Sequence, residues 1–145
     1  MTKEAPTHSV SVAGVVTDAD GRVLVIQRRD NGQWEAPGGV LELGETLEQG
    51  VQREVTEETG VQVTVDGLTG VYKNMSRGIV ALVYRCSVAA GDPRTSNETT
   101  SVRWVDRDQI DLLMSPAYAA RVHDAFNAIA ASRAHDGVNL IDPAR

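Results

Sequence analysis

The chain has 145 residues, of which 41% are hydrophobic and 23% charged, as expected for one ordinary globular domain. A net charge of −6 argues against a broad surface for nucleic-acid polymers, and the single cysteine, Cys86, excludes an intrachain disulfide. The start, MTKEAPTHSVSV, lacks the apolar core of a secretory signal, and no apolar run approaches the ~18 residues of a membrane span. These features predict a cytoplasmic protein without membrane contact.

The beginning of the chain indicates a flexible segment and then two strands. Residues 1–8 are polar and are expected to be flexible. SVSVAGVV, from Ser9, is rich in β-branched residues, which is typical of a strand. The turn signal TDADG leads into RVLVIQRR, so a β-hairpin is expected. TDADG lacks the remaining ligands of a calcium loop and is interpreted as a turn only.

A loop over residues 30–45 precedes the best-defined helix, which is expected from Leu47 to Thr59. Thr46 and Gln49 have the spacing of a capping box, and Gly60 stands where a left-handed residue commonly ends a helix. One apolar stripe along this helix is expected to face the core: Leu47, Val51 and Val55.

The second half of the chain predicts further strands and one closing helix. Residues 61–72 indicate one or two strands, 78–89 a long strand buried on both faces, and 101–105 a short strand. Ser115 and Pro116 are typical of a helix start. The apolar face of that helix comprises Ala119, Val122, Phe126 and Ile129. The folded domain is predicted to span residues 9–133, with a flexible tail at 134–145.

Three carboxylates of the first helix form the clearest chemical pattern. Glu54, Glu57 and Glu58 lie three and four positions apart and therefore share one face. Carboxylates repel each other at that spacing, and the dipole near a helix C-terminus also disfavours them. Their oxygens are the hard donors that Mg²⁺ prefers, together with water and phosphate oxygens. The pattern therefore predicts a magnesium site, the alternative being a solvated acidic face.

The segment GVLELGETLEQGVQREVTEETGV, residues 39–61, resembles the signature of the Nudix hydrolases. That signature specifies Gly, five residues, Glu, seven residues, Arg-Glu, an aliphatic, any residue, Glu-Glu, any residue, Gly and an aliphatic. Every specified position is filled: Gly39, Glu45, Arg53, Glu54, Val55, Glu57, Glu58, Gly60 and Val61.

One feature departs from the family. Positions 50 and 51 are often both alanine there, whereas this chain has Gly50 and Val51. A glycine within a helix costs about 1 kcal/mol relative to alanine. The helix is therefore expected to be looser, or packed unusually closely, at that point.

The resemblance implies an α/β fold, a single-domain α/β/α sandwich with a mixed β-sheet. It also implies Mg²⁺-dependent hydrolysis of a diphosphate linkage attached to a nucleoside, with Mn²⁺ as a substitute cation. The expected metal ligands are the Gly38 carbonyl and the carboxylates of Glu54, Glu57 and Glu58.

Further roles follow from the same resemblance. Arg53 and Glu45 are expected to pair and to hold the loop against the helix. Glu54 or Glu57 is favoured as the group that takes the proton of the attacking water. Glu98 is a candidate remote base or additional metal ligand.

Residues outside the signature carry weaker signals. Arg28, Arg29 and Arg77 are candidate phosphate contacts or solvated strand ends. Trp34 stacks on a base or, as the favoured reading, packs under the turn at residues 37–39. Trp104 and Cys86 are expected to be core residues.

Substrate markers of several subfamilies are not evident outside the signature. The expected reaction is cleavage of a (deoxy)nucleoside triphosphate to the monophosphate and pyrophosphate. ADP-ribose or another nucleoside diphosphate-sugar is the alternative substrate, and a non-catalytic nucleotide-sensing module is the alternative function. The expected partner is a small nucleotide, and the sequence leaves a homodimer open.

Overall fold

The computed structural model describes residues 4–142, which form nine strands and a few helices. The strands are β1 (Ser9–Thr17), β2 (Val23–Arg28), β3 (Trp34–Glu35), β4 (Gly38–Val40), β5 (Gln62–Asn74), β6 (Ile79–Ala90), β7 (Thr99–Val105), β8 (Ala131–His135) and β9 (Leu140–Ile141). The helices are α1 (Leu47–Thr59), the 3₁₀ helix η1 (Arg107–Gln109), α2 (Ile110–Leu113) and α3 (Pro116–Asp124). Over the described residues, no helix has the length and apolar character needed to cross a membrane.

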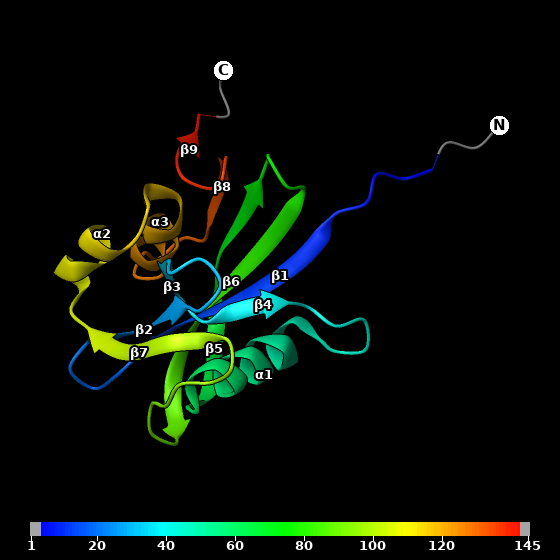
Figure 1. Cartoon of the computed structure of the whole chain (residues 1–145). Coiled ribbons are helices and arrows are strands. Elements are labelled where there is room, and N and C mark those ends of the chain that lie inside the picture. Colours follow the sequence, from blue (N-terminus) through cyan, green and yellow to red (C-terminus); the bar gives the residue numbers. More distant parts are fainter. Residues whose placement is uncertain (1–3, 143–145) are drawn as a thin grey trace.

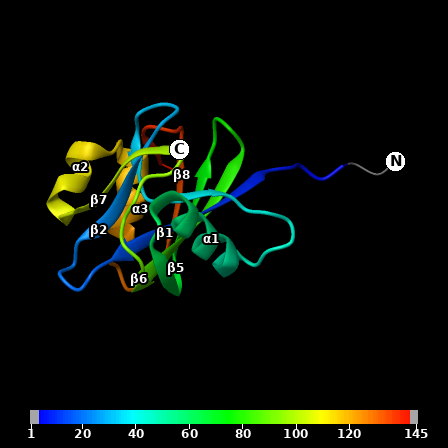
Figure 2. The same cartoon turned by 60° about the horizontal axis from the view of Figure 1, so that its bottom comes forward.

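All strands belong to one mixed sheet (Figure 1). Its order is β3-β2-β1-β6-β5-β8-β9, with β4 paired to β1 and β7 to β2. The β1–β6 pair is parallel, whereas the β5–β6 pair is antiparallel. Residues 4–8 have no helix or strand and extend away from the body in both views (Figure 1 and Figure 2).

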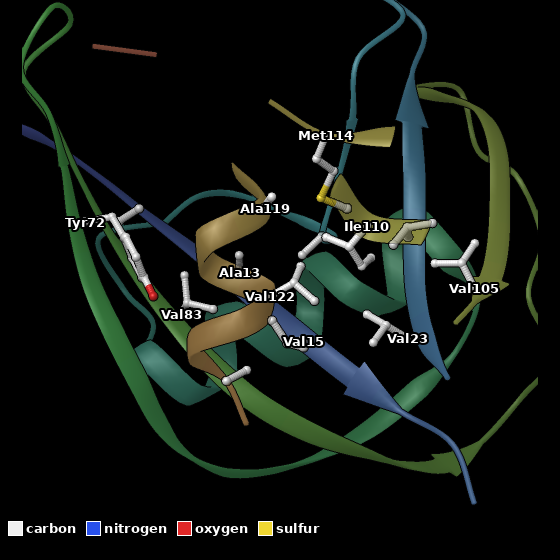
Figure 3. Packing of buried hydrophobic residues seen from close by; sticks show 14 residues of the cluster. Ala13, Val15, Val23, Tyr72, Val83, Val105, Ile110, Met114, Ala119 and Val122 are labelled. Atoms are coloured by element: carbon white, nitrogen blue, oxygen red, sulfur yellow. The ribbon is translucent and has the colours of Figure 1, made fainter. Parts of the chain in front are cut away.

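Side chains of β1 alternate between two cores on opposite faces of the sheet. Val12 and Val16 pack in the core that contains Val51 and Val55 of α1. Ala13 and Val15 pack in the other core, which contains Ala119 and Val122 of α3 and is shown in Figure 3. The expected α/β/α sandwich is therefore confirmed.

Helix α1 begins and ends where its local signals predict. Both hydrogen bonds of the capping box between Thr46 and Gln49 are present, and Gly60 ends the helix with a φ of 77°. Gly50 is closely packed, because a Cβ there would lie 2.6 Å from Leu41 Cδ1 and 3.2 Å from Val12 Cγ2. Of the two expectations for Gly50, close packing is the one observed.

The predicted hairpin between the first two strands is reduced to one paired position, Thr17 with Val23. The remainder of β2 pairs with β7 and β3, because β4 pairs with β1 at residues 11–13. The predicted loop over 30–45 thus contains two short strands, β3 and β4.

The C-terminal prediction is wrong in two respects. The closing helix ends at Asp124, so Ile129 lies beyond it and is exposed. Residues 131–135 then form β8, which pairs in parallel with the free edge of β5, and β9 pairs with β8. Hydrogen bonding to an existing sheet edge therefore orders a segment with few β-branched residues. The described part of the expected flexible tail includes strand residues, while residues 143–145 lie outside the described range.

Candidate functional site

Strand β4 brings two glycines against the acidic face of α1. The Gly38 N–H donates to Glu58 Oε1 at 2.7 Å. A Cβ at Gly39 would lie 2.6 Å from Glu54 Oε1. A side chain at position 39 would displace the Glu54 carboxylate, so glycine is required there. At both glycines, the backbone of β4 therefore lies directly against the carboxylates of α1.

Arg53 connects the acidic residues of this region. Its Nη2 and Nε donate to the two carboxylate oxygens of Glu45 at 2.6 and 2.9 Å, so the expected pairing is present. Nη1 donates to Glu54 Oε1 at 2.9 Å and to Glu57 Oε2 at 3.3 Å. The Arg53 guanidinium holds the pKa of Glu45 down to about 2. The loop before α1 is thus fastened to the helix by a bidentate pair.

The three helix carboxylates differ in their exposure. Glu54 and Glu58 are buried, whereas Glu57 is exposed. Burial raises the pKa of Glu54, and it raises the pKa of Glu58 to about 8 although the Gly38 N–H opposes that shift. A cation between Glu54 and Glu58 would stabilise the ionised form of both carboxylates and would lower their raised pKa values.

The donor set fits a divalent cation, although the side chains do not form a ready-made cage. Across residues 4–142, no group of three acidic, histidine or cysteine side chains is arranged to hold a metal ion. Arg53 is hydrogen-bonded to Glu54 and Glu57 in this arrangement, so its guanidinium supplies the positive charge there. The hard oxygens of Glu54, Glu57 and Glu58 and the adjacent backbone match the preference of Mg²⁺.

Glu98 lies close to this cluster, since its charge raises the pKa of both Glu54 and Glu58. Arg29 holds its loop. The Arg29 N–H donates to the Glu98 carbonyl at 2.9 Å, and the guanidinium donates to the carbonyls of Asn97 and Thr99 at 3.0 and 3.3 Å. Arg29 was expected as a phosphate contact or a solvated strand end. Its guanidinium instead donates to the backbone of the loop that contains Glu98.

A cavity of about 510 Å³ borders the two glycines, which belong to its wall. Segments far apart in sequence enclose it: β1, β3, β6, α3 and the turn between β8 and β9. Its polar lining residues are Ser11, Arg28, Asp30, Asn31, Gln33, Glu35, Asn74, Arg77, Tyr118 and Arg121. A concave site of this size is suited to a small molecule.

Two of the predicted binding residues reach this cavity. Arg28 lines it and pairs with Asp30 at 2.6 Å and more loosely with Glu35 at 3.4 Å. Arg77 is exposed on its rim, and its side chain has no ion pair with the described residues.

Trp34 is not part of this cavity wall. It packs against the core that contains Ala119 and Val122 of α3, and it lines a smaller cavity of about 220 Å³. The guanidinium carbon of Arg103 lies 4.4 Å from the centroid of its ring. Trp104 packs against the α1-side core, as expected. Cys86 is fully buried, and burial raises the pKa of its thiol to about 12, which fits an inert core residue.

Two charged residues of the cavity wall, Glu35 and Arg121, were not predicted as site residues from the sequence. Glu35 directly precedes the Ala-Pro-Gly-Gly turn, so its nearness to the expected site was an available signal. Arg121 had no such signal, because its surroundings come from β5 and β8, which are distant in sequence.

Comparisons with known proteins agree with this geometry. Residues 7–126 match the family model described as the NUDIX domain. A MutT-like protein of Streptomyces ambofaciens is 58% identical over 137 residues, which cover 94% of this chain and 89% of that protein.

More distant relatives have different described substrates. An ADP-ribose pyrophosphatase of Methanocaldococcus jannaschii is 31% identical over 112 residues, which cover 72% of this chain and 66% of that protein. A putative 8-oxo-dGTP diphosphatase of Bacillus subtilis is 27% identical over 114 residues, covering 78% and 76%. The fold is similar to that of a solved NUDIX hydrolase from Nitrosomonas europaea, with a TM-score of 0.78, 22% identity, and coverage of 90% of this chain and 81% of that one.

Proposed function

The chain belongs to the Nudix hydrolase family and is a pyrophosphohydrolase, and from this premise we propose that its substrate is a (deoxy)nucleoside triphosphate. The products are the nucleoside monophosphate and pyrophosphate. One observation carries the proposal: the carboxylates of α1 lie against two glycines that also line the cavity of about 510 Å³. A phosphate chain bound at this wall is therefore next to the acidic cluster.

Nudix hydrolases typically use a divalent metal ion. In the proposal, Glu54, Glu57, Glu58 and the Gly38 carbonyl would hold Mg²⁺, with Glu98 as an additional ligand or remote base. The bound ion supplies Lewis-acid stabilisation of the phosphates and lowers the pKa of an attacking water. Mn²⁺ is a chemically similar substitute.

The chain's own residues position and deprotonate the reactants. The Arg53–Glu45 pair keeps the loop before α1 against the carboxylates. Glu54 or Glu57 takes the proton of the attacking water, and Glu57 is the more exposed of the two. Arg28 and Arg77 line the cavity and offer guanidinium donors to the phosphate chain.

A substrate panel with Mg²⁺ tests the proposal. Each nucleoside triphosphate and ADP-ribose is incubated with the protein, and products are identified by chromatography. Release of pyrophosphate from a triphosphate is expected. If no triphosphate is turned over while ADP-ribose is cleaved, the triphosphate proposal fails and the substrate class of the Methanocaldococcus relative applies.

Glu57→Gln tests the assigned chemistry. Loss of a general base or metal ligand is expected to lower kcat by about 10²–10⁴-fold, while a non-hydrolysable triphosphate analogue still binds. Glu48→Gln is the matched control, because Glu48 is exposed on the first turn of the same helix. Equal kcat values for the two variants would contradict the role of Glu57.

A further inference from the structure

Arg121 is held in the cavity wall by two aromatic rings. Its guanidinium carbon lies 5.2 Å from the centroid of the Tyr72 ring and 4.6 Å from that of Tyr118. The side chain comes from α3, and the residue lines the cavity of about 510 Å³. Cation–π contacts on two rings fix the orientation of the cation.

The hydrogen-bonding capacity of Arg121 is almost unused. Its Nε is buried without a partner among the described residues, and its polar contact is from Nη2 to His135 Nε2 at 3.1 Å. The Gly137 N–H already donates to His135 Nδ1 at 2.9 Å. The proton of a neutral imidazole then lies on Nε2, which faces another donor. Among the described contacts, the fixed guanidinium of Arg121 therefore has no hydrogen-bond acceptor.

Glu35 provides an acceptor in the same cavity. Its side chain is 15% exposed, and its ion pair is a loose one with Arg28 at 3.4 Å. Burial raises the pKa of Glu35 and lowers that of Arg121, and the charge of each residue opposes the shift of the other. Within the described part of the chain, no ion pair joins them. An acid and a cation thus line one cavity without neutralising each other.

Part of the cavity wall is apolar, as the face of an aromatic base requires. Small or apolar side chains line it: Ala13, Ala36, Ile79, Ala81 and Val138. The Asn74 side-chain Oδ1 accepts from the N–H groups of Ser76 and Arg77, so the Nδ2 group of the same side chain is left as a donor. Asp30 also lines the wall, but its carboxylate already accepts two hydrogen bonds from Arg28. Glu35 is therefore the buried acceptor on the side of Arg121, and Asn74 is a further donor.

We propose that Glu35 and Arg121 select the base of the substrate by its Watson–Crick edge, in favour of a 6-oxopurine of the guanine type. Arg121 donates to O6, and Glu35 accepts from N1–H and the exocyclic amine. Adenine places a donor against the guanidinium and an acceptor against the carboxylate, which leaves both charges unpaired. The inference rests on the proposed function, since it assumes a nucleoside substrate.

The same pairing predicts what these residues do not select. Oxidation at C8 alters the imidazole side of guanine and leaves O6, N1–H and the amine unchanged. Changes at Glu35 or Arg121 should therefore shift the guanine-to-adenine ratio without shifting the ratio of oxidised to normal guanine.

Binding without turnover tests the pair directly. Affinities for GMP, IMP and AMP are measured by calorimetry in chelator, and kcat/KM is measured for dGTP, 8-oxo-dGTP and dATP with Mg²⁺. The wild type is expected to bind GMP at least about tenfold more tightly than AMP, because each good base contact contributes about 1–3 kcal/mol. IMP, which lacks the amine, should fall between them.

Glu35→Gln is expected to remove most of the GMP preference, and Arg121→Lys to reduce it because the planar fork is lost. Glu4→Gln, in the exposed N-terminal segment, is the matched control. Thermal unfolding checks that each variant is folded, and Arg121→Lys carries the test if Glu35→Gln does not fold.

Two results overturn the inference: a wild-type GMP-to-AMP ratio near one, or a ratio unchanged in the folded variants. In either case triphosphate hydrolysis can still stand. Conversely, GMP selectivity that depends on Glu35, in a protein that cleaves no triphosphate, supports the inference and defeats the proposed substrate. The two failures are therefore distinguishable.

Discussion

The position of one carboxylate depends on a missing side chain at Gly39. A Cβ at that position would lie 2.6–2.8 Å from three carboxyl atoms of Glu54. No carbon approaches so closely without displacing its neighbour. Glu54 is also fixed by Arg53, so its carboxylate cannot move independently of that contact.

Gly39→Ala is therefore expected to displace the Glu54 carboxylate and to lower kcat/KM by about 100-fold, the cost of a misplacement of about 1 Å. Steady-state kinetics measures this loss. Gly44→Ala is the control, because a Cβ at Gly44 would meet no atom within 4 Å. Wild-type kinetics in Gly39→Ala would show that Glu54 does not need its observed position.

At the scale of elements, β8 contains a histidine that has to remain neutral. His135 is fully buried, and burial followed by the charge of Arg121 lowers its pKa below the ordinary value of 6.5. The unfolded chain consequently binds more protons than the folded one once the pH falls below about 6.5. The contribution of His135 to stability is present above that pH and is lost on acidification.

His135→Gln is expected to flatten the pH dependence of the free energy of unfolding between pH 7 and pH 5. Urea unfolding at several pH values measures this slope. Carboxylates also titrate on acidification, so the relevant quantity is the difference between the variant and the wild type. His8→Gln, in the exposed N-terminal segment, should keep the wild-type slope. A steeper slope in His135→Gln would contradict a neutral buried imidazole.

At the scale of the whole molecule, elements that depend on local signals could be predicted from the sequence, whereas elements that depend on contacts between distant segments could not. Helix α1 has its cap, apolar stripe and terminating glycine within one segment, so its bounds could be predicted. Glu45, Arg53 and the three helix glutamates lie in that segment too, which is why their spacing exposed the site. Strand β8 has no comparable pattern, because the open edge of β5 supplies its hydrogen bonds.

The cavity could not be predicted for the same reason. Its walls combine β1, β3, β6, α3 and the β8–β9 turn, and these segments meet only in the folded chain. Glu35 and Arg121 line one cavity only because these segments come together in the fold. Residues 107–113, which form η1 and α2, were assigned no structure because their pattern is too short to establish a helix.

Strand β8 also determines where the folded unit ends. Arg133 donates to both oxygens of the Asp124 carboxylate, at 2.7 and 2.8 Å, and the Tyr72 hydroxyl donates to the same carboxylate at 2.8 Å. This contact joins β5, α3 and β8 around a buried acid. The family match ends at residue 126, before the strand that supplies the cation.

A chain ending at residue 130 is therefore expected to lose about 1–3 kcal/mol of its free energy of unfolding, because the buried Asp124 carboxylate loses the donors of Arg133, whose own side chain is 40% exposed. A chain ending at residue 142 keeps β8 and β9 and should match the full-length protein. Urea unfolding of both chains measures the difference, and Arg133→Gln in the full chain isolates the share of the ion pair. Equal free energies of unfolding for the two shortened chains would mean that β8 pairs with the sheet without adding to its stability. The domain would then end at the limit of the family match.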